Sequence, residues 1–404
     1  MDSATRKKRL FWYFVIMAVY SVVSNFAHPA TPTIIKNLNL HDYMFGVAFA
    51  GMSITNFLFS PFWGRISDQI GRNKVFLACG IGYGVGQAVF GMATTELGIL
   101  FGRMISGFFI GGGSVVQLSY IMDYSDAEQR GKNFTLLAVI QSVSSAAGYL
   151  IGGYISEYSI PMMFVLQVIS LAATGIIFAV LCKDNEELKF SKKIIWKEAA
   201  KGSNPFGAFA RVGKQMTKVL IILSCITLIA SFANTAYDQC FNYYIKDQYF
   251  FSPSNNGVLR AGLGIVALVA NMSVGMWIMK RTNLFKSLIV VLGAYGTFLI
   301  GLLFPQALAP FVVINIFLYS LNALYNPLIQ ATYAQGVPDQ KQSGVFMGVF
   351  TSLKALGMVA GSLFAGFIYG FGPRLSFLYA MAGLFIACAL AVWAYAARKK
   401  ELGK

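Results

Sequence analysis

Charge is scarce in this sequence. Asp, Glu, Lys and Arg make up 12% of its 404 residues, against about 25% in an ordinary soluble domain. A surface that faces water on all sides cannot be built from so few charges, which excludes a soluble enzyme and a disordered chain. The five cysteines form no CxxC pair and lie in or beside apolar segments. A disulfide-rich secreted domain is therefore excluded, and we expect neither a metal nor a cofactor.

Long apolar runs take the place of the missing charge. Hydrophobic residues make up 56% of the chain, and a helix needs about 20 apolar residues to cross a bilayer. The sequence predicts twelve such spans, at residues 10–33, 42–63, 74–94, 97–122, 133–156, 160–182, 219–244, 255–279, 285–304, 309–333, 344–369 and 375–397. The fold class is therefore an all-α membrane protein with twelve transmembrane helices.

The basic residues are distributed unequally between the two sides of the predicted spans. Of 32 Lys and Arg residues, 26 fall on the side of the N-terminus, 4 fall on the opposite side and 2 lie within spans. Cytoplasmic loops carry an excess of basic residues. The sequence therefore predicts a multi-pass protein of the cell membrane with both termini in the cytoplasm. The formal net charge of +16 reflects this orientation, and no nucleic-acid partner is expected.

The two halves of the chain share a sequence repeat. Five pairs of identical residues are separated by the same offset of 213 positions: Asp126/Asp339, Gln129/Gln342, Gly131/Gly344, Gly148/Gly361 and Gly153/Gly366. The repeat predicts two pseudo-symmetric six-helix halves at residues 1–182 and 219–404, joined by a cytoplasmic linker at 183–218. Parallel repeats of this kind are typical of secondary transporters with a site near the midplane. A duplicated membrane scaffold that transports nothing is the alternative.

The loop after the second span carries a motif. Residues 64–74 read Gly-Arg-Ile-Ser-Asp-Gln-Ile-Gly-Arg-Asn-Lys, which resembles the signature G-x-x-x-D-x-x-G-R-x-K/R of the major facilitator superfamily. The resemblance implies the major facilitator fold and a conformational gate. It assigns the gate to Gly64, Asp68, Gly71 and Arg72, with the aspartate contacting the start of span eleven in the outward-open state. Asp123, at the end of span four, is placed to pair with Arg72 or Arg65.

Two further segments resemble the drug:proton antiporter branch of that superfamily. Arg103 begins an R-x-x-x-G pattern in span four, where the branch has a buried arginine that takes part in proton coupling. Span five is similar to the antiporter pattern G-x-x-x-G-P-x-x-G-G. Here Ser144 replaces the first glycine and Tyr149 replaces the proline, so the glycines permit close helix packing without the bend that proline gives.

Ionisable residues inside spans are costly and indicate function. Asp238 lies about 9 Å from the outer end of span seven, and His28 lies at a similar depth in span one. A buried carboxylate or an imidazole can take up and release a proton, so Asp238, His28 and Arg103 are candidates for proton coupling. Alternatively, Asp238 is a gate residue bonded to Asn234 or Asn242, and His28 is a packing residue.

Polar residues within the spans indicate a substrate cavity. Span ten carries Asn315, Tyr319, Asn322 and Asn326 on one helical face, and a polar face within the membrane needs water or partners. Asn25, Gln117 and Gln141 add amides from spans one, four and five. Lys354 lies about 15 Å deep in span eleven. It is expected either to bind substrate or to pair with a carboxylate.

These observations predict a secondary transporter and not an enzyme. The leading hypothesis is proton-coupled efflux of small organic or amphipathic molecules by alternating access. The alternative is an uptake or exchange carrier for an organic anion or another small nutrient, which Lys354, Arg103 and the replacement of proline by Tyr149 favour. The expected partners are a small-molecule substrate, protons and the lipid bilayer, and the chain is expected to act as a monomer.

Overall fold

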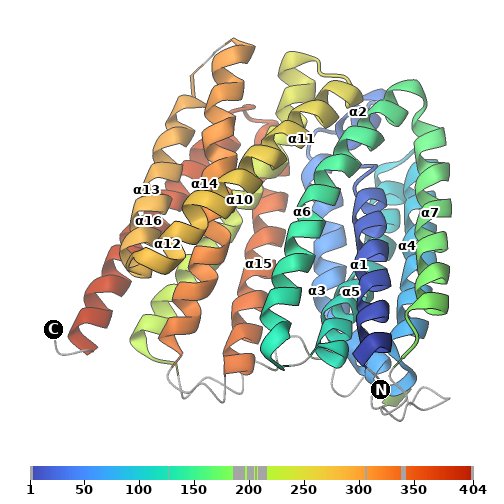
Figure 1. The fold of residues 1–404 in the computed structure, drawn as a ribbon. Helices are drawn as coiled ribbons and strands as arrows, with labels where there is room; N and C mark the ends of the chain where they lie inside the picture. The colour runs from blue at the N-terminus through green and yellow to red at the C-terminus, as the bar shows by residue number, and fades with distance from the viewer. Residues whose placement is uncertain are drawn as a thin grey trace. The chain divides into compact units, whose positions relative to one another are not determined.

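The computed structural model describes residues 3–125, 127–184, 216–304, 307–337 and 343–401, together with residues 196, 197, 204 and 207. These residues form helices joined by short turns, and no strand occurs among them (Figure 1). The first half contains α1 (Ser3–Ser24), α2 (Thr31–Asn37), α3 (Met44–Ile70), α4 (Arg72–Met92), α5 (Glu96–Tyr124), α6 (Ala127–Tyr158) and α7 (Ile160–Leu181). The second half contains α10 (Lys218–Tyr249), α11 (Pro253–Ala270), the π-helical turn η2 (Asn271–Gly275), α12 (Met276–Arg281), α13 (Leu284–Gly301), α14 (Leu308–Gly336), α15 (Ser343–Tyr369) and α16 (Leu375–Glu401).

Within the described residues, eleven helical stretches are long and apolar enough to cross a membrane. Helix α1 is not among them because Lys7, Lys8 and Arg9 place three charges in its first half. Helix α1 nevertheless covers residues 10–24 of the first predicted span. Two parts of the sequence repeat, Asp126 and residues 338–342, lie outside the residues that the structure describes. Most of the predicted linker is likewise outside the described residues.

The first predicted span, 10–33, is interrupted. Helix α1 ends at Ser24, and residues 25–30 form turns before α2 begins at Thr31. Two prolines explain the break, because Pro29 disfavours helical geometry in the residue before it and Pro32 is tolerated in the first turn of a new helix. His28 therefore lies in a turn and not in a transmembrane helix, as the span prediction had it.

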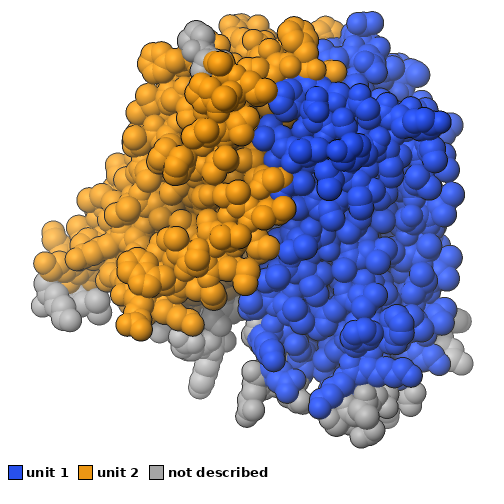
Figure 2. Space-filling view, turned by 45° about the horizontal axis from the view of Figure 1, so that its top comes forward, with its two compact units in different colours: residues 1–40, 51–205, 251–261 blue, residues 41–50, 206–250, 262–404 orange. Residues whose placement is uncertain are grey.

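The described chain clusters into two compact units, which Figure 2 draws in different colours. Unit 1 comprises residues 1–40, 51–205 and 251–261, and unit 2 comprises residues 41–50, 206–250 and 262–404. The first residues of α3 thus belong with unit 2, and the first residues of α11 belong with unit 1.

Repeat-related glycines stand at close helix contacts inside each unit. A Cβ atom at Gly148 of α6 would overlap the carbonyl oxygen of Val22 in α1, and one at Gly361 of α15 would overlap the carbonyl oxygen of Phe232 in α10. Both helix pairs therefore touch backbone to backbone, which requires glycine at these two positions.

A second pair of repeat-related glycines explains how the two short segments join their units. A Cβ at Gly153 of α6 would lie 3.1 Å from the Cα of Gly257 in α11, within unit 1. A Cβ at Gly366 of α15 would lie 3.2 Å from the Cα of Gly46 in α3, within unit 2. We call these two contacts the glycine crossings. Each one joins helices from different halves of the sequence.

The glycine contacts make a prediction about stability. The Gly148→Ala variant should lower the free energy of unfolding by about 1–3 kcal/mol, because the methyl group overlaps backbone that cannot move aside. Gly262→Ala is the matched control, since nothing lies within 4 Å of a Cβ at Gly262, and alanine there should be neutral or stabilising by about 0.5–1 kcal/mol. Thermal unfolding of the purified variants measures both, and equal stability of the two variants would contradict the packing argument.

Candidate functional site

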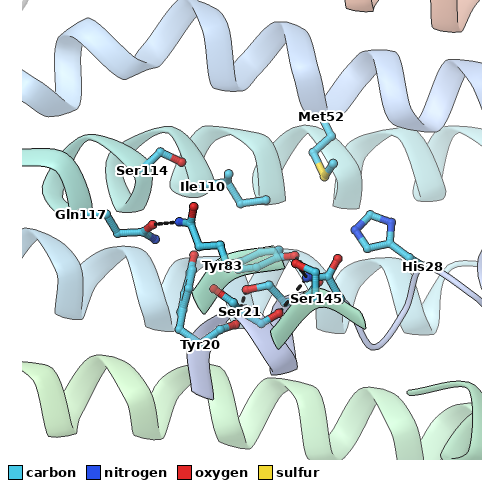
Figure 3. Close-up of a pocket in the computed structure, with 12 residues that line it drawn as sticks. Tyr20, Ser21, His28, Met52, Tyr83, Ile110, Ser114, Gln117 and Ser145 are labelled. Atoms are coloured by element: carbon cyan, nitrogen blue, oxygen red, sulfur yellow. Dashed lines mark hydrogen bonds between the residues drawn. The ribbon is translucent and has the colours of Figure 1, made fainter. Parts of the chain in front are cut away.

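Unit 1 contains a polar cavity of about 300 Å³ between α1, α3, α4, α5 and α6 (Figure 3). Four residues that the sequence assigns to substrate or proton sites line it: Asn25, His28, Gln117 and Gln141. Most of the remaining wall consists of serine and tyrosine hydroxyls. His28 and Gln117 lie toward opposite ends of the cavity. The described residues that line it include no Asp, Glu, Lys or Arg, so the cavity favours hydrogen bonding over ion pairing.

The amides of this cavity are held by contacts between helices. Gln141 of α6 donates from Nε2 to Oε1 of Gln117 in α5 at 2.8 Å. Asn25 donates from Nδ2 to the carbonyl oxygen of Ser21 at 2.7 Å and to Oγ of Ser145 at 3.1 Å. These bonds fix the orientation of each side chain. Among the described residues, the amide oxygen of Asn25 accepts no hydrogen bond.

Arg103 does not line this cavity. It is 4% exposed, donates from Nη2 to Oγ1 of Thr31 at 2.8 Å, and places its guanidinium 4.1 Å from the centre of the Phe90 ring. Its Nε has no hydrogen-bond partner among the described residues. Arg103 therefore ties α5 to the start of α2, directly after the turn that carries His28. His28 itself stacks on Tyr149 with the ring centroids 5.6 Å apart.

In unit 2, tyrosines of α10, α13 and α14 satisfy the polar groups of α10 and α14. Tyr319 donates to Oδ1 of Asp238 at 2.8 Å, so a residue that the sequence assigns to substrate holds the candidate proton site. Tyr295 donates to Oδ1 of Asn234 at 2.7 Å. Asn315 is fully buried, accepts from Tyr237 at 2.6 Å and donates to the Phe311 carbonyl oxygen. Its amide oxygen is thus bonded to α10, and its amide nitrogen is bonded within α14.

A second polar group in unit 2 contains Lys354. Its Nζ donates to Oδ1 of Asn326 at 3.0 Å, and Asn326 donates in turn to Oδ1 of Asn322 at 2.9 Å. No carboxylate among the described residues of unit 2 forms an ion pair with Lys354. The three side chains form a chain from α15 to α14 that ends in a half-buried ammonium group.

The predicted gate residues form a polar cluster at one end of unit 1. Arg72 donates from Nε to Oδ2 of Asp123 at 2.9 Å, which selects one of the two pairings that the sequence allowed. The same guanidinium contacts Asp68 and donates to Oγ of Ser67 at 2.6 Å. Asp68 is mostly exposed. No Cβ is tolerated at Gly71, because its φ is +104°. Gly64 has room for a Cβ, 3.5 Å from Val115.

Asp184 completes this cluster, although no sequence motif marks it. Its Oδ1 accepts from the backbone N–H groups of Arg72 at 2.8 Å and of Asn73 at 3.0 Å, so it caps the start of α4. Burial raises the pKa of the Asp184 carboxyl above its usual value, while the two backbone donors oppose that rise. A cap usually stands beside its helix in the sequence. Here it lies 112 residues away, and only the fold brings the two together.

The Asp184 cap predicts a pH-dependent stability. Because the folded pKa exceeds the unfolded one, the folded state holds the proton more tightly, and this carboxyl's contribution to stability is lost as the pH rises through the folded pKa. The Asp184→Asn variant keeps an acceptor oxygen without a titrating charge. We expect its unfolding free energy to lack that decline as the pH rises above the usual carboxyl range.

The Asp184→Ala variant removes the acceptor altogether and should lose about 1 kcal/mol at low pH, a loss that shrinks as the pH rises through the folded pKa. Thermal unfolding of the purified variants measures both effects. Superimposable unfolding profiles for the wild type and the alanine variant would show that the cap stabilises nothing.

Comparisons with known proteins agree with this architecture. The sequence model of the Major Facilitator Superfamily matches residues 13–352. The quinolone resistance protein NorA of Staphylococcus aureus is 23% identical over 362 residues, which is 88% of each chain. Multidrug resistance protein 2 of Bacillus subtilis is 21% identical over 87% of this chain and 86% of its own.

A bacterial homologue of the human lysosomal transporter Spinster shares the fold, with a TM-score of 0.76, 15% identity and 98% of both chains covered. The human organic anion transporter MFSD10 shares it with a TM-score of 0.70 and 16% identity over 97% of this chain and 100% of its own. The chain therefore belongs to the Major Facilitator Superfamily and is a membrane transporter.

Proposed function

We propose that the protein exports small organic or amphipathic molecules in exchange for protons. The polar cavity of unit 1 is the observation that carries this proposal, since its volume of about 300 Å³ suits a small ligand and its lining offers hydrogen bonds rather than fixed charge. Two relatives are named for resistance to quinolones and to multiple drugs, which export would explain. The proposed location is the plasma (inner) membrane of the cell, with both termini in the cytoplasm.

The proposed coupling group is Asp238. It is half-buried in α10 and accepts from Tyr319, and a carboxylate at this depth can lose its charge by taking a proton. Protonation removes the charge that holds the Tyr319 hydroxyl. Because Tyr319 shares α14 with Asn322 and Asn326, a proton on Asp238 would change the helix that carries the proposed substrate residues. His28 and Arg103 are proposed to assist from unit 1.

Alternating access requires helix contacts that open and close. The glycine crossings are proposed as such contacts, because the helices meet there at glycine backbone. Opening the Gly46–Gly366 crossing would also break the hydrogen bond from Ser362 Oγ to the Gly46 carbonyl oxygen at 2.6 Å. At the other end, the Arg72–Asp123 pair, with Asp68, Gly64 and Gly71, is proposed as the gate. Export would then follow from alternate release of the crossings and the gate.

Coupling through Asp238 can be tested in everted membrane vesicles from cells that express the protein. A transported dye should induce proton release with the wild type, and the Asp238→Asn variant should abolish that release because the side chain no longer titrates. The matched control is Asp247→Asn, which changes another carboxylate of α10 that also accepts from a tyrosine, Tyr369 at 2.8 Å. Proton release that persists in Asp238→Asn would exclude this residue from coupling.

A second candidate function is uptake or exchange of an organic anion. The observation that favours it is Lys354, whose ammonium group contacts Asn326 and no carboxylate among the described residues of its own unit. A half-buried cation without such a counterion attracts an anion. The human organic anion transporter of similar fold is consistent with this candidate.

The anion candidate predicts that Lys354→Gln weakens binding of an organic acid about tenfold to a hundredfold, because a hydrogen bond to a charged group contributes about 1.5–3 kcal/mol. Neutral dyes should bind as before. The control is Lys286→Gln, in the same unit, where the ammonium lies over the Tyr395 ring at 5.8 Å. Binding is measured by ligand-dependent thermal shift, and unchanged affinity for the acid would rule out Lys354 as its site.

A further inference from the structure

Unit 2 contains a second cavity that plays no part in the proposed transport. It measures about 490 Å³ and lies where the end of α10, the turn after α13 and the start of α16 meet. Tyr244 and Gln248 contribute from α10, and Leu303 from the turn after α13. The segment before α16 contributes Phe371 and Arg374, and Leu378 comes from the first turns of α16.

One cation dominates this cavity. Arg374 donates from Nε to the hydroxyl oxygen of Tyr244 at 3.2 Å. Tyr244 is itself 4% exposed and is held between the rings of Phe311 and Phe377. The bond to a buried hydroxyl fixes the guanidinium plane. Among the described residues no other hydrogen bond or ion pair involves the side chain of Arg374, so its two terminal NH₂ groups are available to a ligand that accepts two hydrogen bonds.

The rim of the cavity is apolar and open. Phe371 is 83% exposed and Leu378 is 38% exposed. A large aromatic ring that is exposed beside a cation indicates contact with an apolar group as well as with water. Together these groups match an amphiphile that has an anionic head and an apolar tail.

The length of α16 gives the level of the cavity in the membrane. This helix has 27 residues and ends in Arg398, Lys399 and Lys400, so it extends about 40 Å from Arg374 to its basic end. That length exceeds a hydrocarbon core of about 30 Å. With the basic end at one surface, Arg374 lies at the headgroup level of the opposite leaflet.

We propose that this cavity binds the headgroup of an anionic phospholipid. The phosphate accepts two hydrogen bonds from the Arg374 guanidinium, and the acyl chains lie along Leu378 and the exposed ring of Phe371. A soluble phosphate would satisfy the guanidinium equally but would leave the apolar rim unused. The combination of cation, rim and depth therefore selects the lipid over the free anion.

Native mass spectrometry of the full-length protein tests the assignment. The protein is purified in detergent, incubated with phosphatidylglycerol, and the bound lipid is counted. We expect the Arg374→Gln variant to retain about tenfold less phosphatidylglycerol than the wild type, because it loses a charge-assisted pair of hydrogen bonds. Arg374→Lys should fall between the two, since it keeps the charge without the planar fork.

The control variant is Lys246→Gln, which removes another basic residue near the end of α10 that does not line the cavity. It should retain lipid like the wild type, and thermal unfolding should show that all three variants are folded. Equal lipid retention in Arg374→Gln and the wild type would overturn the proposal. So would displacement of the lipid by millimolar glycerol 3-phosphate or inorganic phosphate, which would assign the site to a soluble anion.

Discussion

Close approach of helix backbones at glycine is the constraint on which the structure depends. Lipid provides little hydrophobic drive between transmembrane helices, so helices associate through packing and through the hydrogen bonds they can form at short range. In unit 1, Gly148 brings α6 against α1, and in unit 2 Gly361 brings α15 against α10. The amide contacts of Asn25 with α6 are possible only because α1 and α6 lie this close. The proposed substrate cavity is thus a consequence of the glycine packing beside it.

The two units use one architecture for different chemistry. Unit 1 offers a cavity of amides and hydroxyls with His28 at one end. The described part of unit 2 holds a carboxylate on Tyr319 and an ammonium on Asn326. A duplicated scaffold retains its helix contacts because these fix the fold, while side chains that face the interior are free to diverge. This division lets the proposed proton site and the proposed substrate cavity lie on different helices.

The sequence predicts the helices and the motif well, because both depend on local composition. Apolar runs of about 20 residues fix the spans, and Gly71 and Arg72 stand where their motif expects a turn and a cation. The first span is predicted to be too long, because hydropathy does not reflect the effect of Pro29 and Pro32 on the backbone. Asn315 fits the polar face of α14 by spacing, yet Tyr237 occupies its amide. Helical periodicity cannot show which neighbour a face meets.

Asp184 shows a further limit, because contacts between residues far apart in sequence leave no local signal. The carboxyl caps α4 from the end of the first half, and only the folded chain reveals it. The same holds for the glycine crossings, where the repeat indicates Gly153 and Gly366 but not their partners Gly257 and Gly46.

The central claim is that a glycine crossing must open during transport. Tyr43 and Phe367 stack beside the Gly46–Gly366 crossing with ring centroids 5.3 Å apart. Cysteines at these two positions, in a protein whose five native cysteines are replaced, can be joined by a short cleavable thiol crosslinker. The decisive measurement is the transport rate of the crosslinked protein in vesicles. We expect transport to stop on crosslinking and to return when the bridge is reduced, whereas transport at the uncrosslinked rate with the bridge complete would contradict the account.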